Sequence, residues 1–204
     1  MQLHAFHLSG HSHRVRLFLS LLGLAYEEVE VDMRSGAHHA PAHLALNPFG
    51  QLPVLVDGAD VVCDSTAILV YLARKYAPAG WLPEAPADLA AVQRWLSVAS
   101  GELANGPAVA RGIHLWQRPM DAAPFVAKAH GLLARLEAHL AGREWLATGR
   151  PTVADVALYA YVESAPEGGV DLAAYPSVRR WLGKIEALPG FVPFPRSPIG
   201  LRAA

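Results

Sequence analysis

Hydrophobic and polar positions in the first part of the chain alternate between strand and helix patterns. Residues 3–8 are predicted to form a strand, and residues 15–22 carry apolar side chains at helical spacing. Residues 26–32 alternate between apolar and acidic side chains, which is typical of a half-buried strand. Residues 33–46 predict a loop with a short helix.

The stretch 47–72 combines a turn, a hairpin and a capped helix. Val54–Val56 and Val61–Cys63 are predicted strands joined around Asp57-Gly58, a strong hairpin signal. Asp64-Ser65 then caps a helix with an apolar face. The order is strand, helix, strand, irregular helix, strand, strand, helix, which requires a parallel pair followed by an antiparallel hairpin. This is the thioredoxin-like order.

After residue 77 the pattern changes to helices alone. The proline-rich segment 78–87 is predicted to link a domain at 1–77 to an all-helical domain at 88–204. Four helical patterns follow, and the last segment contains three prolines and is expected to run over the surface. The helices are expected at 89–103, broken or kinked at Gly106-Pro107, at 125–140, at 156–162 behind a Thr152–Asp155 capping box, and at 178–188, before the tail 191–204.

Composition and charge restrict the functional classes. A net charge of −1 across 204 residues, with ten histidines counted as neutral, argues against nucleic acid or an anionic membrane as a partner. No signal peptide or membrane-length apolar run is visible, so we expect a cytoplasmic protein. The single cysteine, Cys63, excludes an internal disulfide and is expected in the core. Histidine spacing fits no common zinc site, and no metal is predicted.

Two features of the stretch 47–72 exceed what a plain hairpin needs. Pro53 directly precedes a strand, where a cis bond would expose the backbone N–H and C=O of Val54 to a peptide-like ligand. Asp64-Ser65 places a carboxylate beside the free N–H groups of a helix N-terminus, which together suit the two charges of an α-amino acid. For either feature alone, an ordinary turn or an ordinary cap is the alternative.

Together these residues resemble the glutathione-binding half of the cytosolic glutathione transferases. In that family Gln-Leu/Val-Pro holds the cysteinyl backbone of glutathione and Glu/Asp-Ser holds its γ-glutamyl group, which implies these roles for Gln51-Leu52-Pro53 and Asp64-Ser65. The capping box at residues 152–155 resembles the family's C-terminal landmark. The resemblance implies an α/β plus all-α fold, a thioredoxin-like domain before an all-helical one, a homodimer and a ligand cleft between the domains.

Residues Ser9–Arg16 indicate how the glutathione sulfur would be activated. This run resembles Ser-Ser-Cys-Ser-x-Arg-Val-Arg of the zeta class and Ser-Gly-Asn-x-x-Lys-Val-Arg of bacterial members. Both comparisons imply that the Ser9 hydroxyl donates to the sulfur, and Ser12 is the alternative. Other members of the family use a Tyr late in the first strand or a Cys just after it, as in glutaredoxin-like members. No Tyr or Cys lies in the first 24 residues here, so we expect neither of these two ways of contacting the sulfur. His11 is a further candidate donor, although a solvated loop histidine is its simpler interpretation.

The remaining site residues also follow from the resemblance. His38 falls where the family has basic residues near the glycine carboxylate of glutathione. Phe49 is expected either to contact a partner subunit or to pack within its own loop. For Arg111 and His114 a solvated helix face is the preferred interpretation. The second substrate, a small hydrophobic electrophile, is expected against an apolar and aromatic wall. This wall comprises Leu8, His11, Arg111, His114 and Trp116.

Three functional hypotheses follow from the resemblance. The first is a serine-type glutathione transferase that conjugates glutathione to hydrophobic electrophiles in detoxification, with disulfide or peroxide reduction as a side activity. The second is a zeta-type glutathione-dependent isomerase, which the replacement of the zeta cysteine by His11 disfavours. The third is a non-catalytic binding protein, which ranks last because Gln51, Pro53, Asp64 and Ser65 are all present.

Overall fold

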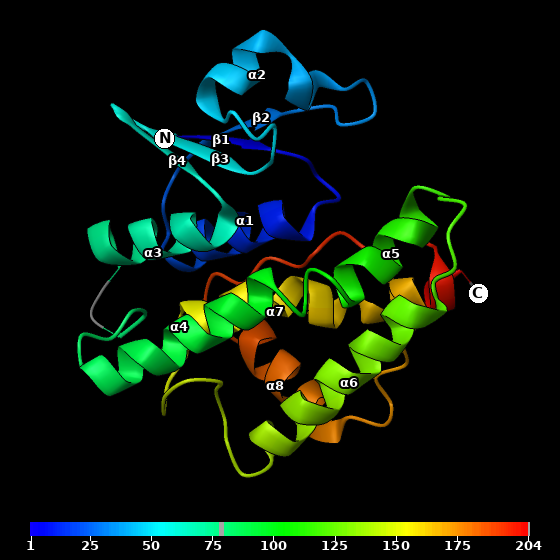
Figure 1. Ribbon diagram of the computed structural model, residues 1–204. Coiled ribbons are helices and arrows are strands. Elements are labelled where there is room, and N and C mark those ends of the chain that lie inside the picture. Colours follow the sequence, from blue (N-terminus) through cyan, green and yellow to red (C-terminus); the bar gives the residue numbers. More distant parts are fainter. Residues whose placement is uncertain (78–79, 204) are drawn as a thin grey trace.

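The computed structural model describes residues 1–77 and 80–203. A four-stranded mixed sheet lies at the centre of the N-terminal half (Figure 1). Strand β1 pairs in parallel with β2 and antiparallel with β3, and β3 and β4 form a hairpin with a two-residue loop at 58–59. The strand order is β2-β1-β3-β4, which confirms the predicted thioredoxin-like fold class. The strands are β1 (Gln2–Ala5), β2 (Glu27–Glu30), β3 (Val54–Asp57) and β4 (Asp60–Cys63).

Helices cover both faces of this sheet. Figure 1 shows α1 and α3 on the face that is turned toward the helical half, with α2 on the opposite face. Strand β1 ends earlier than the sequence pattern predicts, because the N–H of Ser9 closes a turn onto the carbonyl of Phe6 at 3.0 Å. These helices are α1 (Gly10–Leu21), η1 (Ala37–His39), α2 (Pro41–Leu46) and α3 (Ser65–Lys75).

In the C-terminal half the described residues form helices joined by loops, and no strand occurs among them. Helix α7 is buried along its whole length and packs against α1, α3, α4 and α8, as its all-round apolar sequence predicts. Within residues 1–77 and 80–203, no helix is both long and apolar enough to cross a bilayer. The elements are α4 (Pro86–Ser100), α5 (Pro107–Leu115), α6 (Ala123–Leu140), α7 (Val153–Glu163), η2 (Ala165–Gly168), α8 (Pro176–Glu186) and η3 (Gly200–Arg202).

The capping box that opens α7 is a buried hydrogen-bond centre. The Thr152 N–H donates to Asp155 at 2.9 Å, and the Thr152 hydroxyl accepts from the Ala154 N–H at 3.3 Å. Asp155 also accepts from the Leu146 N–H at 3.0 Å and from the indole N–H of Trp181 at 2.9 Å. One carboxylate therefore fixes the start of α7 relative to the preceding loop and α8, which confirms the predicted cap.

Three details differ from the sequence prediction. Of the predicted linker 78–87, residues 78–79 lie outside the described residues, and α4 already begins at Pro86, since proline is well suited to a first helical turn. The helix expected to reach residue 103 ends at Ser100. Cys63 is half-buried rather than a core residue, because it lies at the end of an edge strand, where its thiol donates to the Leu46 carbonyl.

The tail does not run freely over the surface as its prolines predicted. Phe194 is buried among core residues, and the Ser197 N–H donates to Glu167 at 3.0 Å. Arg202 donates to both Glu163 and Glu167, at 2.6 Å and 2.8 Å. The tail is ordered in this way because the buried carboxylates of α7 and η2 require cationic partners.

A buried ion pair joins this tail to the turn that precedes α1. The Arg111 Nε donates to Glu167 at 2.7 Å, and the two side chains are only 3% and 0% exposed. The Arg111 Nη1 donates to the Leu8 carbonyl at 2.8 Å. Glu167 therefore links α5, the tail and the segment Leu8-Ser9 through one carboxylate.

We predict that Glu167→Gln lowers the free energy of unfolding by about 3 kcal/mol, because it leaves the buried Arg111 cation without its anion. Urea unfolding of the two proteins measures the difference. The matched control is Glu102→Gln, which removes an exposed partner of Arg135 and should cost under about 1 kcal/mol. Equal losses in the two variants would contradict a structural role for the buried pair.

A second prediction concerns pH and the buried His13, whose Nε2 has no hydrogen-bond partner among the described residues. Burial and the charge of Arg16 lower the pKa of His13 from 6.5 to about 3. Below pH 6.5 His13 binds a proton in the unfolded chain but stays neutral in the folded chain. The free energy of unfolding therefore falls as pH drops toward 3, by up to about 1.4 kcal/mol per pH unit.

Urea unfolding at several pH values between about 7 and 4.5 tests this. We expect His13→Gln to lose less stability over this range than the unaltered chain does, because glutamine does not titrate. His7→Gln, which changes an exposed histidine, serves as the control. An identical pH dependence in the unaltered chain and His13→Gln would exclude the buried histidine as a cause.

Candidate functional site

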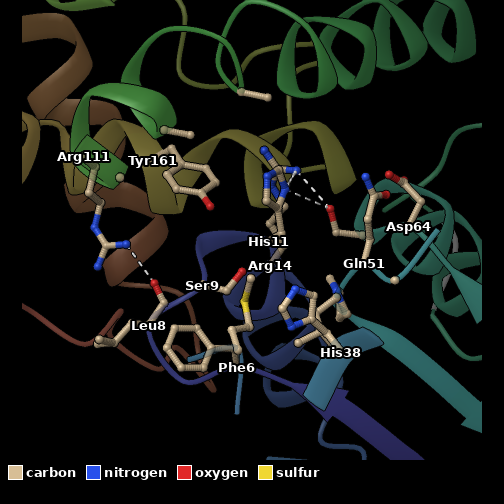
Figure 2. Close-up of a pocket in the computed structure, with 18 of the residues that line it drawn as sticks. Phe6, Leu8, Ser9, His11, Arg14, His38, Gln51, Asp64, Arg111 and Tyr161 are labelled. Carbon is tan, nitrogen blue, oxygen red and sulfur yellow. Dashed lines mark hydrogen bonds between the residues drawn. The ribbon is translucent and has the colours of Figure 1, made fainter. Parts of the chain in front are cut away.

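A cavity of about 540 Å³ lies where the sheet domain faces the helical half. Figure 2 shows 18 of the residues that line it. The lining comes from the turn before α1 and the start of α1, from η1, from the segment before β3, from the start of α3, from the end of α4 and from helices α5 and α7. The sequence-predicted residues on its wall are Leu8, Ser9, His11, His38, Phe49, Gln51, Leu52, Pro53, Asp64, Ser65, Arg111 and Trp116. The fold thus gathers segments more than a hundred residues apart in the sequence around one pocket.

Ser9 lies on the pocket wall at the N-terminus of α1. It is the N-cap: its backbone is extended, and its hydroxyl oxygen accepts from the Ser12 N–H at 3.3 Å. This bond occupies a lone pair of the oxygen and leaves the hydroxyl hydrogen free to donate. A helix of twelve residues also places partial positive charge at this end. The position therefore combines a free hydroxyl donor with a helix N-terminus.

Ser12 lies beneath this position rather than on the pocket wall. Its side chain is fully buried, and its hydroxyl oxygen accepts from the Phe6 N–H at 3.2 Å. Ser12 is not among the residues that line the cavity. Its contacts fix the turn between β1 and α1, on which Ser9 sits.

His11 is not the solvated loop histidine that its sequence context suggested. It is the second residue of α1, half-buried, and its Nδ1 lies 2.9 Å from Nη1 of Arg14. A guanidinium only donates, so Nδ1 must accept, and the remaining ring proton is on Nε2. Burial and the charge of Arg14 lower the pKa of His11 to about 3, so the ring is neutral at neutral pH.

Arg14 is a buried cation behind the start of α3. The same Nη1 donates to the Ser65 hydroxyl at 3.0 Å, and Nη2 donates to the Ala99 carbonyl at 3.2 Å. Burial lowers the pKa of Arg14 to about 10, which leaves it charged at neutral pH. Its charge therefore lies beside Ser65 and the pocket without a direct carboxylate partner among the described residues.

Asp64 caps α3 in an unusual backbone conformation. Its φ of +71° lies in a region that non-glycine residues rarely adopt, and it costs on the order of 1 kcal/mol. Its Oδ1 accepts from the N–H groups of Thr66 and Ala67 at 2.8 Å and 3.0 Å. Burial raises the pKa of Asp64, but the bonds from Thr66 and Ala67 outweigh it, so the pKa is lowered and the carboxylate is ionised. Asp64 also faces the pocket.

Gln51, Leu52 and Pro53 line the cavity, and the Leu52–Pro53 bond is cis, as the sequence suggested. The Gln51 carbonyl is held by the side-chain amide of Asn47 at 2.9 Å. Val54 begins β3 with a buried side chain and does not line the cavity.

His38 lies in η1 on the pocket wall beside His39. Its Nδ1 is buried with no partner among the described residues, and burial lowers the pKa of His38. Despite the nearby histidines, the described part of the chain contains no group of three or more His, Cys, Asp or Glu side chains able to hold a metal ion.

The far side of the pocket is apolar and aromatic. The rings of Phe6 and Trp116 stack with centroids 5.6 Å apart, and Leu8 lies on the same wall. His114 is exposed and does not line the cavity, which agrees with a solvated helix face. For Arg111 that interpretation was wrong, because the Glu167 carboxylate and the Leu8 carbonyl draw its guanidinium into the interior.

Phe49 is 83% exposed, so it does not pack within its own loop. Exposure of a large apolar side chain to water costs free energy, and burial against a partner subunit would remove that cost.

Sequence reasoning missed several residues on the pocket wall, and Arg14 and Tyr161 are the two with the clearest chemical consequence. Arg14 belongs to the Arg-Val-Arg run on which the resemblance rested, so that run could have identified Arg14 as a pocket residue. Tyr161 belongs to an α7 that is apolar on every side, so periodicity does not reveal which of its residues reaches the pocket.

Two family models match this chain. The N-terminal domain of glutathione S-transferase matches residues 8–75, and the C-terminal domain of glutathione S-transferase matches residues 125–189. Glutathione S-transferase 3 of Zea mays is 38% identical, over 97% of each chain. A maleylacetoacetate isomerase of Rhizobium meliloti is 37% identical, over 82% of this chain and 83% of its own.

The fold agrees with these sequence matches. A solved glutathione S-transferase from Pseudomonas fluorescens superimposes with a TM-score of 0.89 and 31% identity, covering 96% of this chain and 98% of its own. The two family models lie in the two halves of the molecule and include the pocket residues of the turn before α1, the segment before β3, the start of α3 and α7, but not those of α5. The chain therefore belongs to the glutathione transferase family, whose enzymes use glutathione as their co-substrate.

Proposed function

We propose that this pocket binds glutathione, holds its sulfur as a thiolate through Ser9, and conjugates it to a small hydrophobic electrophile. The observation that carries the proposal is the position of Ser9, which is on the pocket wall and caps α1 with its hydroxyl hydrogen free. Ser12 is the weaker candidate for the sulfur partner because it is fully buried and does not line the cavity.

In this proposal the start of α3 holds the γ-glutamyl end of glutathione. The ionised Asp64 carboxylate pairs with the α-ammonium group, and the N–H of Ser65, the first residue of α3, donates to the α-carboxylate. Arg14 supports this subsite with its positive charge and with its bond to the Ser65 hydroxyl. The arrangement matches both charges of an amino acid head group.

The rest of glutathione extends along the wall formed by Gln51, Leu52 and Pro53. The segment Gln51-Leu52-Pro53 offers backbone groups to the cysteinyl unit, as the family resemblance implies. The glycine carboxylate then approaches His38, which lines the cavity. This orientation turns the sulfur toward Ser9.

Activation of the sulfur requires stabilisation of a negative charge. A free thiol has a pKa of about 8.5, and lowering it by about two units takes roughly 2.7 kcal/mol. A hydrogen bond to a charged acceptor contributes about 1.5–3 kcal/mol, and a helix N-terminus adds about 0.3–1 kcal/mol. Ser9 and the start of α1 together supply this amount.

The electrophile lies against the aromatic wall of Phe6 and Trp116, with Leu8 beside it. An apolar wall favours hydrophobic substrates and displaces water from the reacting atoms. The thiolate attacks the electrophilic carbon and a C–S bond forms. The electron pair of the broken bond goes to the leaving group or, when the electrophile is an epoxide, to the ring oxygen. The same thiolate is chemically competent to attack a disulfide or a peroxide.

A zeta-type isomerase is the second candidate, and the similarity to an enzyme named maleylacetoacetate isomerase favours it. In an isomerase, glutathione adds to the substrate and leaves again, so free glutathione is regenerated. His11 occupies the position of the zeta cysteine as a neutral ring bonded to Arg14, which argues against the same chemistry. Mass spectrometry of the products distinguishes a stable conjugate from regenerated glutathione.

The proposal includes a homodimer and a cytoplasmic location. The exposed Phe49 provides an apolar anchor beside the glutathione wall for a second copy of the chain. Glutathione is kept reduced in the cytosol, where the proposed detoxification reaction would have its co-substrate.

We predict that Ser9→Ala raises the pKa of the bound glutathione thiol by about 1–2 units, because one hydrogen bond to the charged sulfur is lost. Ultraviolet absorbance of the bound thiolate against pH measures this. Affinity for S-methylglutathione, which carries no thiolate, should be unchanged.

Ser9→Thr serves as the matched variant, because threonine retains both the cap and the hydroxyl donor. Retention of a low thiol pKa in Ser9→Ala would assign the role elsewhere, with Ser12→Ala as the next variant to measure.

A further prediction concerns Asp64→Asn, which keeps a good helix cap but removes the negative charge. We expect glutathione affinity to fall about tenfold or more, measured by calorimetry, because the α-ammonium loses its partner. An analogue of glutathione without the α-amino group should bind both proteins equally. Asp57→Asn, in the hairpin and outside the pocket, is the control, and an equal loss there would contradict the assignment.

A further inference from the structure

Tyr161 places a phenol on the pocket wall from the C-terminal half. Its side chain is 7% exposed and lines the cavity together with Ser9. Figure 2 shows its hydroxyl pointing into the pocket, on the side where Ser9 lies, with no hydrogen bond drawn to it. Among the described residues, Tyr161 thus has a buried ring and an unpartnered hydroxyl that faces the site.

The ring is held against the N-terminus of α1. A Cβ on Gly10 would lie 2.7 Å from Cζ of Tyr161, the carbon that bears the hydroxyl, and within 2.9 Å of both adjacent ring carbons. Only a glycine at position 10 permits this approach without displacing the ring. The hydroxyl carbon of Tyr161 is therefore in contact with the residue that follows Ser9.

Two further contacts fix the orientation of this ring. The His11 ring packs edge-on with its centroid 5.0 Å away, and the Arg14 guanidinium lies 5.7 Å from the ring centroid. Contacts from three residues of α1 leave the ring little freedom to turn its hydroxyl away from the pocket. Such fixed donors stabilise a developing charge without reorganisation at the moment of reaction.

We infer that Tyr161 is a catalytic residue whose hydroxyl donates a second hydrogen bond to the sulfur of bound glutathione, beside that of Ser9. The inference rests on the proposed function, because it requires the sulfur to lie at the N-terminus of α1. A thiolate has several lone pairs, so it accepts two hydroxyl donors at once. The tyrosine absent from the first strand would then be supplied by α7 of the other domain.

The test is Tyr161→Phe, which removes the hydroxyl and keeps the ring against Gly10. We expect the pKa of the bound glutathione thiol to rise by about one unit, which corresponds to about tenfold less thiolate at a pH below both values. The rate of conjugation at that pH should fall by a similar factor. Ultraviolet titration of the bound thiolate and steady-state kinetics measure the two effects.

Tyr159→Phe is the matched control, since Tyr159 is on the same helix but its hydroxyl donates to Glu186 outside the pocket. It should leave the thiol pKa unchanged. S-methylglutathione should bind Tyr161→Phe as tightly as the unaltered protein, because only the charged sulfur uses the lost donor. In Ser9→Ala combined with Tyr161→Phe, the pKa should rise further than in either single variant.

The outcomes separate this inference from the proposed function. Absence of any bound thiolate in the unaltered protein near neutral pH would overturn both. A bound thiolate with the same pKa in the unaltered protein and Tyr161→Phe would overturn the role of Tyr161 alone, including the case in which the variant is slower. An equal loss of S-methylglutathione binding would identify Tyr161 as a packing residue and overturn the inference.

Discussion

The close approach of α1 and α7 at Gly10 is the contact on which the site depends. It places the N-terminus of a twelve-residue helix at the wall of the cavity between the domains, where its partial positive charge faces the cavity. Helix α7 can hold α1 there because it is buried along its whole length and its start is fixed by the Thr152–Asp155 box. Packing in the helical half thus positions the chemistry of the sheet domain.

Two buried arginines connect α1 and the turn before it to other elements of the fold. Arg14 connects α1 to the start of α3 and to α4, so the proposed sulfur and γ-glutamyl subsites share one cation. Arg111 connects α5 to the turn before Ser9, and Glu167 extends that connection to the tail. A buried cation is costly unless it is paired or hydrogen-bonded, so the ion pair of Arg111 and the hydrogen bonds of Arg14 favour one arrangement of the two domains over others.

The sequence predicted the fold well where local chemistry determines it. The capping box at residues 152–155, the hairpin at Asp57-Gly58 and the cap at Asp64 need only neighbouring residues, and each formed as expected. Tyr161 and Arg111 could not be assigned in this way, because their positions depend on contacts with α1 and Glu167 far away in the sequence. Without a structure, burial of an arginine cannot be read from its helix face alone.

The central claim is that the pocket is built to hold glutathione as a thiolate. Calorimetric titration in buffers of different ionisation enthalpy counts the protons released when glutathione binds. We predict release of about one proton per glutathione near neutral pH, and of none with S-methylglutathione, because the site favours the charged sulfur. Tight binding of glutathione at that pH without proton release would contradict the account.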